Sequence, residues 1–189
     1  MTELASLRRP PLISASPLLR LLPPAARHVL RAAPEALLAA GEALGLSLSM
    51  PVCRASVHGD RAALWLGPDE RLLLGADESA ADTNARLARA LAGQPYSLVD
   101  ISHRQLGLEL NGPHAAVVLA TGCPLDLDPQ AFPVGMCTRT VLAKAEIVLW
   151  RVTVDSFHLE VWRSFAAYVS AVIAEATREL ALDDSGRTT

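Results

Sequence analysis

A strand–turn–strand–helix pattern occurs twice in the chain, and this repetition constrains the fold more than any other feature. ALWLGPDERLLL (residues 63–74) places a Gly-Pro-Asp turn between two apolar runs and precedes a stretch of helix-forming residues. IVLWRVTVDSFHLEVW (residues 147–162) has the same order and also precedes a helical pattern. Antiparallel strands interspersed with helices predict an α+β fold, with antiparallel sheets, packed helices and duplicated strand-strand-helix units.

The first part of the sequence predicts a helix, an antiparallel meander and a second helix. Pro34 suits the opening turn of the first helix, and Gly45 suits its left-handed C-terminal cap. The expected ranges are 35–44 for the helix, 46–57, 61–66 and 71–74 for the strands, and 79–92 for the second helix.

The second part repeats this order. The expected strands are 96–101, 105–110, 138–143, 146–152 and 157–162, with a helix that Pro113 opens and that ends near Thr121. In the last strand the side chains alternate, so that His158, Glu160 and Trp162 share one face. Ser164 is the expected cap of a final helix. The apolar positions of this helix recur every three or four residues: Phe165, Tyr168, Val169, Val172, Ile173, Ala176 and Leu180.

Prolines divide the chain into regions. Residues 1–34 hold six of the thirteen prolines, which disfavour a helix or a central strand there. We therefore expect a Pro/Arg-rich N-terminal arm over 1–34, which either lies along this domain or another subunit or is partly disordered. A single α+β domain made of two related halves is expected over 35–182, with a flexible tail over 183–189.

The composition of the chain restricts the cellular compartment and the classes of partner that we expect. Apolar residues make up 51% of the chain, but Pro, Arg or Asp interrupts every apolar run short of the ~20 residues of a membrane span. The net charge of −3 does not favour nucleic-acid binding. Three cysteines without close spacing fit the reducing cytoplasm, and prolines interrupt the amphipathic helix that an Arg-rich transit peptide would need.

Motifs with catalytic chemistry are not apparent. Ser102 and His103 are adjacent, but neighbours on a strand point to opposite faces. Cys123 and Cys137 form no C-x-x-C pair, which makes a zinc site with His103 or His114 a weak interpretation. We instead expect both cysteines to be buried free thiols. Asp126 and Asp128 are interpreted as loop residues rather than as an acid–base pair. No glycine-rich nucleotide motif occurs. We therefore predict no catalytic, cofactor-binding or metal-binding residue on this chain.

The long irregular segment GCPLDLDPQAFPVGMCTRT (residues 122–140) needs a different explanation. Loops of this length in compact domains are usually functional or disordered, and its apolar content argues against disorder. Our hypothesis is that Phe132, Met136 and Arg139 help to dock a partner subunit, with Trp150 and Trp162 as neighbours. The alternative is that these side chains fill the core of their own domain.

Four motifs in one collinear block identify a family resemblance. SHRQ (102–105), GCPLDLD (122–128), FPVGMCTRT (132–140) and LAKAEIVLWR (142–151) together resemble the gamma subunit of heterotetrameric sarcosine oxidase, and the resemblance covers roughly residues 50–180. It implies a fold similar to the folate-binding domain of the glycine cleavage T-protein, an aminomethyltransferase, which is itself built from two related halves.

The resemblance also implies a function. Such a complex oxidatively demethylates sarcosine to glycine with oxygen and tetrahydrofolate, and yields hydrogen peroxide and methylenetetrahydrofolate. FAD, NAD and covalently attached FMN are then expected on the alpha and beta partner subunits, and zinc on delta. Gamma is expected to be non-catalytic and to act in assembly and stability. The alternatives are a stand-alone folate-binding or aminomethyl-transfer protein and a transient flavoenzyme assembly factor.

Overall fold

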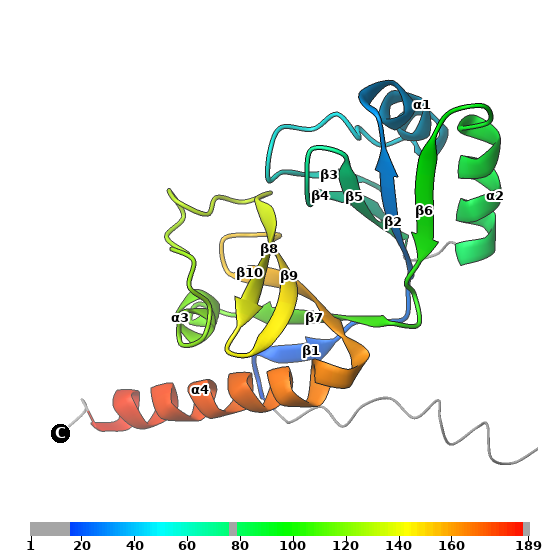
Figure 1. Cartoon of the computed structure of the whole chain (residues 1–189). Coiled ribbons are helices and arrows are strands. Elements are labelled where there is room, and N and C mark those ends of the chain that lie inside the picture. The colour runs from blue at the N-terminus through cyan, green and yellow to red at the C-terminus, as the bar shows by residue number, and fades with distance from the viewer. Residues whose placement is uncertain (1–15, 76–78, 187–189) are drawn as a thin grey trace, which may run out of the picture.

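The chain forms two five-stranded sheets in which every pair of neighbouring strands is antiparallel (Figure 1). This is a computed structural model, and it describes residues 16–75 and 79–186. The first sheet has the order β3 (Ala55–His58), β4 (Arg61–Trp65), β5 (Glu70–Gly75), β2 (Ala26–Ala32) and β6 (Tyr96–Asp100). The second sheet has the order β1 (Leu19–Leu21), β7 (Gln105–Asn111), β10 (Ser156–Trp162), β9 (Ala145–Arg151) and β8 (Cys137–Leu142).

Each sheet carries two helices. The first half consists of the first sheet with α1 (Pro34–Leu44) and α2 (Ala80–Ala90), and the second half of the second sheet with α3 (Ala115–Ala120) and α4 (Ala166–Gly186). Separate apolar cores lie between each sheet and its helices, and a third apolar cluster joins the two sheets. The structure therefore confirms the predicted α+β class. Within the described residues, no helix combines the length and the apolar character that a bilayer span requires.

The two halves exchange one strand each. β1 precedes β2 in the chain, yet it pairs with β7 in the second sheet; β6 precedes β7, yet it pairs with β2 in the first sheet. The crossovers 22–25 and 101–104 connect the sheets. At the crossovers the Leu22 amide donates to the Gly107 carbonyl at 2.9 Å, and the Ile101 amide donates to the Arg27 carbonyl at 2.8 Å. The two repeats in the sequence thus form two halves that each contribute one strand to the sheet of the other.

Two predictions for the first half are wrong. Residues 1–34 were expected to hold no central strand, but β2 lies between β5 and β6. The prolines do not prevent this, because none occurs between Pro24 and Pro34. The expected strand 46–57 is also wrong, since only Ala55–His58 is a strand. The alternation of apolar residues with serine reflects burial of every second side chain in an irregular loop. These buried side chains are Leu46, Leu48 and Met50.

Apart from the short edge strand β1, which was not predicted, the remaining elements agree with the sequence patterns to within a few residues. Ser79 caps α2, accepting a hydrogen bond from the Asp82 amide at 3.1 Å. Ser164 lies inside a short 3-10 turn, Arg163–Phe165, instead of capping α4, and α4 continues to Gly186. The boundaries of the arm, the single domain and the tail stay predictions, and residues 1–15, 76–78 and 187–189 lie outside the described residues.

Candidate functional site

Two clefts open between the sheets, one beside each crossover. Cleft 1, of about 230 Å³, lies beside 101–104, and cleft 2, of about 260 Å³, lies beside 22–25. Glu160 on β10 lines both clefts. The strand exchange therefore creates two hollows of similar size around one buried carboxylate.

This carboxylate joins the two halves. Arg27 Nε on β2 donates to Glu160 Oε2 at 2.6 Å, and both side chains are almost fully buried. The Nε2 atom of His158 lies 2.8 Å from Glu160 Oε1. Burial by itself raises the pKa of Glu160, but the hydrogen bonds and charges of His158 and Arg27 outweigh it and lower the pKa. Glu160 is therefore ionised, and His158 Nε2 carries the proton that it accepts.

Gly107 makes room for this ion pair. It lies directly opposite Glu160 in the pairing of β7 with β10. A Cβ atom at Gly107 would come within 2.8 Å of Arg27 Nη2 and 3.2 Å of Glu160 Oε1. A larger residue at this position would therefore force the Arg27 guanidinium to shift, because a Cβ atom does not approach another heavy atom within 3.0 Å.

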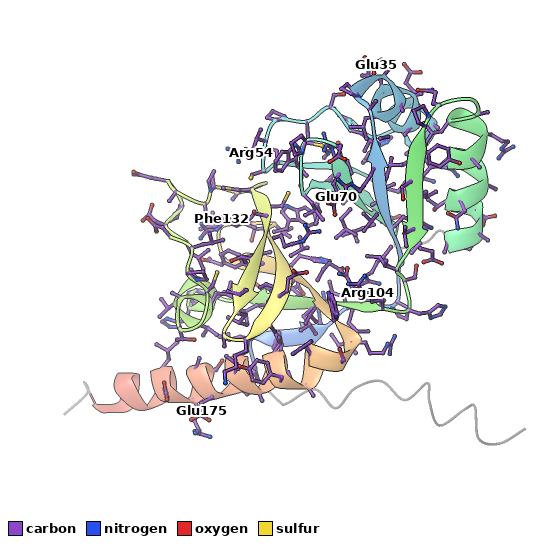
Figure 2. All side chains as sticks on the ribbon, in the orientation of Figure 1. Glu35, Arg54, Glu70, Arg104, Phe132 and Glu175 are labelled. Atoms are coloured by element: carbon purple, nitrogen blue, oxygen red, sulfur yellow. The ribbon has the colours of Figure 1, made fainter. Side chains whose placement is uncertain are left out.

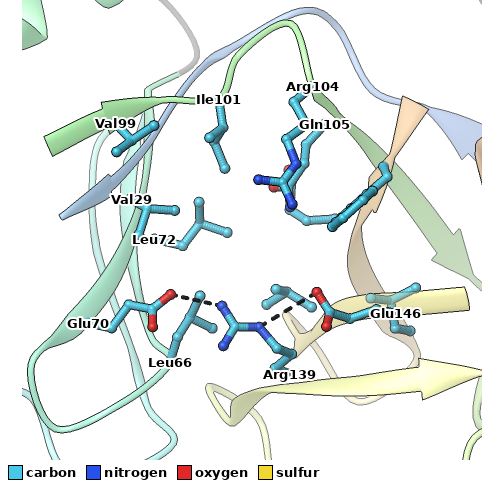
Figure 3. Close-up of a pocket in the computed structure, with 14 residues that line it drawn as sticks. Val29, Leu66, Glu70, Leu72, Val99, Ile101, Arg104, Gln105, Arg139 and Glu146 are labelled. Carbon is cyan, nitrogen blue, oxygen red and sulfur yellow. Dashed lines mark hydrogen bonds and ion pairs between the residues drawn. The ribbon is translucent and has the colours of Figure 1, made fainter. Parts of the chain in front are cut away.

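A second, exposed ion pair spans the mouth of cleft 1 (Figure 3). Arg139 Nη2 on β8 lies 2.8 Å from Glu70 Oε1 on β5, and Arg139 Nε lies 3.9 Å from Glu146 Oε1. The Arg139 side chain is 41% exposed. Since Glu70 belongs to the first half and Arg139 to the second, this ion pair also connects the halves, but in contact with water.

The other end of cleft 1 holds a stacked arginine. The guanidinium carbon of Arg104 lies 4.0 Å from the centre of the Trp162 ring, a cation–π distance (Figure 3). Gln105 also lines the cleft, and among the described residues its buried side-chain oxygen has no hydrogen-bond partner. Figure 2 places Glu70 on the first half and Arg104 close to the crossover between the halves.

Cleft 2 is the more apolar of the two. Pro23, Pro24 and Val57 line it together with Trp150 and His158, whose ring centres are 5.7 Å apart. The indole nitrogen of Trp150 is buried, and within the described part of the chain it has no acceptor. His158 is already engaged by Glu160, so the rings serve as walls of the cleft.

The polar residues of the second crossover hold the backbone in place. Ser102 Oγ donates to Asp100 Oδ1 at 2.6 Å, and the Arg27 amide donates to Ser102 Oγ at 2.9 Å. Partial burial raises the pKa of Asp100, but the hydrogen bonds from Ser102 and the nearby His28 and His103 lower it overall. Ser102 thus holds the backbone of the crossover in place.

The Cys137 thiol and the carboxylates of the long loop also form hydrogen bonds within the chain. Cys137 donates to the Trp65 carbonyl at 3.7 Å, and burial raises the pKa of its thiol to about 12. Asp126 accepts from the Asp128 amide, and Asp128 from the Gln130 amide, as loop carboxylates do. In the part of the chain that the structure describes, no three His, Cys, Asp or Glu side chains form a group that could hold a metal ion.

The structure separates the three residues of the docking hypothesis. Phe132 is only 1% exposed and belongs to the core of the second half. Met136 is half-buried against the same core, and Arg139 lies at cleft 1. Contact with a partner subunit stays a prediction for Met136 and Arg139, whereas Phe132 could act only indirectly. Of the two tryptophans, Trp162 lines cleft 1 and Trp150 lines cleft 2.

The pairing of Arg27 with Glu160 was not predicted from the sequence. The shared face of His158, Glu160 and Trp162 on β10 was predicted correctly, and all three line a cleft. Leu159 and Val161 on the opposite face are fully buried in the helix-covered core. The signal for the missed pairing was therefore a glutamate on a strand that is covered on both faces. A glutamate on such a strand must have a buried partner.

The architecture is shared with a glycine cleavage system aminomethyltransferase. The glycine cleavage system aminomethyltransferase T from Bartonella henselae superposes with a TM-score of 0.62 over 82% of this chain and 44% of that chain, at 14% identity. A chain of the heterotetrameric sarcosine oxidase from Corynebacterium sp. U-96, solved in complex with pyrrole 2-carboxylate, superposes with a TM-score of 0.80. That match covers 88% of both chains at 32% identity.

Sequence comparison defines the family more narrowly. The profile of the sarcosine oxidase, gamma subunit family matches residues 30–179. The sarcosine oxidase subunit gamma of Corynebacterium sp. (strain P-1) is 37% identical over 77% of this chain and 70% of its own length. The subunit gamma of an Arthrobacter species is 38% identical over 70% of this chain and 64% of its own length. The chain therefore belongs to the sarcosine oxidase, gamma subunit family.

Proposed function

We propose that this chain is the non-catalytic gamma subunit of a heterotetrameric sarcosine oxidase, in which it contributes to assembly and stability. The observation that carries the proposal is the match to a chain of the Corynebacterium sp. U-96 enzyme, which extends over 88% of both chains with a TM-score of 0.80. At 32% identity over that length, the two chains share more than a general fold.

The complex would oxidatively demethylate sarcosine to glycine in the cytoplasm, forming hydrogen peroxide and methylenetetrahydrofolate. Alpha, beta and delta subunits would be the partners, and they would hold FAD, FMN, NAD, tetrahydrofolate and zinc. The clefts of this chain support a structural role, because their central charges are engaged within the chain. Glu160 binds Arg27 and His158, and Arg139 binds Glu70.

Co-expression with the three companion subunits tests the proposal. We expect size-exclusion chromatography to elute this chain with the others in equal amounts, and the complex to absorb as a flavoprotein and oxidise sarcosine. Without this chain, the yield and thermal stability of the remaining complex should fall. Sarcosine oxidation or flavin absorbance by the chain alone would contradict the proposal.

A second candidate follows from the shared fold. The aminomethyltransferase T match, with a TM-score of 0.62, favours a stand-alone folate-binding or aminomethyl-transfer protein. Isothermal titration of the isolated chain with tetrahydrofolate distinguishes the two, because saturable binding to the free chain is expected only for this candidate. The amount of this chain in the purified complex distinguishes a permanent subunit from a transient assembly factor, because a transient factor would be absent from that complex.

A further inference from the structure

Three aromatic side chains gather where β10 runs into α4. The chain has eight aromatic residues, and Trp162, Phe165 and Tyr168 are three of them. Phe165 and Tyr168 are 40% and 37% exposed. The apolar periodicity of this segment alone would predict their burial. Instead, Val169 and Ile173 make the core contacts of α4, so that the two rings remain at the surface.

These rings are held in place rather than loosely exposed. Trp162 packs edge-on against Phe165, with ring centres 6.5 Å apart, and carries Arg104 on its face. The Tyr168 hydroxyl accepts a hydrogen bond from the Lys144 amide at 3.4 Å. Ordered aromatic and arginine side chains lose little conformational entropy on binding, and Trp, Tyr and Arg dominate the energetics of protein interfaces.

The same surface carries a local excess of positive charge. The Arg163 amide donates to the Arg104 carbonyl at 2.8 Å, and Arg163 Nε donates to the His103 carbonyl at 3.1 Å, so the two arginines lie side by side. Among the described residues, neither forms an ion pair with a carboxylate. Their two charges exceed the single charge of Asp100, which precedes the crossover and accepts a hydrogen bond from Ser102. The charges at the mouth of cleft 1 behave differently, since Arg139 pairs with Glu70 and Glu146.

We propose that Arg104, Trp162, Arg163, Phe165 and Tyr168, together called the aromatic ledge, dock an acidic loop of a companion subunit of the oxidase. Carboxylates of that loop would pair with the two arginines. Its apolar side chains would cover the exposed rings and enter cleft 1, which begins at Arg104 and Trp162. The inference rests on the proposed function and adds to it the surface and the chemistry of the partner.

Charge reversal and ring removal test the ledge in the co-expressed complex. We expect R104E/R163E and F165A/Y168A each to weaken the association of this chain with its companions by about tenfold or more, as truncation of interface hot spots does. The matched controls are R89E on α2 and Y96A on β6. Both residues are exposed and lie in the first half, outside the ledge. They should associate like the unchanged protein, and association of the unchanged protein, but not of R104E/R163E, should weaken with added salt.

Two further measurements keep the outcome clear. Circular dichroism melting of the isolated variants shows whether they fold, and hydrogen exchange of the unchanged complex requires no variant. We expect segments 101–104 and 162–168 to become protected on assembly. Normal association of both folded double variants, or unprotected ledge segments in the complex, would contradict the docking role of the aromatic ledge but not the proposed function. Failure of the unchanged chain to associate with its companions would contradict both proposals.

Discussion

The two halves are built on one plan but differ in how they fill their cores. In the first half, α1 and α2 have 11 residues each; in the second, α3 has 6 residues and α4 has 21. The short α3 leaves space over its sheet, and residues of the long following loop occupy that space. Cys123, Leu127 and Phe132 of this loop belong to the second core.

A buried arginine supports the loop after the first helix in each half. In the first half, Arg71 Nε donates to the Leu48 carbonyl at 2.8 Å, and burial lowers the pKa of Arg71. In the second half, Arg151 Nη1 donates to the carbonyls of Phe132 at 2.7 Å and Leu127 at 3.1 Å. An irregular loop leaves carbonyls without strand partners, and a buried guanidinium satisfies several of them at once.

The comparison explains the long motif-rich segment without invoking catalysis. The segment is rich in proline, aspartate and apolar residues because, as a loop, it fills a part of the second core that a longer helix would otherwise cover. A loop can do so only if its side chains fill a defined space and its backbone groups are hydrogen-bonded.

The largest effect that tests this comparison is expected from F132A. If the loop is part of the core, removing the ring should lower the free energy of unfolding by about 3–5 kcal/mol, as for other buried phenylalanines. Urea unfolding followed by circular dichroism measures it. V134A, at an exposed position of the same loop, should change stability by about 0.5 kcal/mol or less. An equally small effect of F132A would show that the loop is not a core element.

A somewhat smaller effect is expected from breaking the contact between the halves. E160Q leaves the buried Arg27 without its counter-charge and should cost about 3 kcal/mol. R139Q removes the exposed ion pair that also joins the halves, and should cost about 0–1 kcal/mol. Urea unfolding of both variants compares them directly. Similar costs would mean that burial does not distinguish the two contacts.

The same ion pair predicts a pH dependence. The pKa of Glu160 in the folded protein is lower than its ordinary value of 4.5. Its contribution is therefore complete above about pH 4.5 and is lost as the pH falls through the folded pKa. The unfolding free energy of the unchanged protein should fall more steeply below this pH than that of E160Q. Parallel pH profiles would show that Glu160 is not ionised in the folded state.

The smallest effect concerns thiol reactivity and involves no change in stability. Cys53 in the first half is partly exposed, whereas Cys123 and Cys137 in the second half are buried. With the pKa of Cys137 raised to about 12, its thiolate is scarce at neutral pH. A thiol-specific chromogenic reagent should label one cysteine in the native protein and all three in denaturant. Rapid labelling of all three would show that the second core opens readily.

The sequence predicted most elements and the faces of the strands in the second half. Alternation along residues 157–162 predicted that His158, Glu160 and Trp162 share one face, opposite Phe157, and the structure confirms this. That the shared face lines the clefts between the sheets is seen only in the structure. It did not predict β2, because the clustered prolines concealed an uninterrupted strand between them. It also did not predict the burial of Phe132, because a loop residue is placed by distant contacts rather than by periodicity.

By itself, the sequence determined the class of the fold, the internal repeat and the family. The fold class and the repeat depend on the spacing of apolar residues and turns, which each segment carries within itself. The family resemblance depends on the identity of the residues in the four motifs between 102 and 151. Only the tertiary structure decided that β1 and β6 join the sheet of the opposite half, and that Arg27 meets Glu160 across a separation of 133 residues. The reason is that strand exchange and charge burial gain free energy only when both halves have formed. Such cooperation between distant segments leaves no periodic trace in the chain.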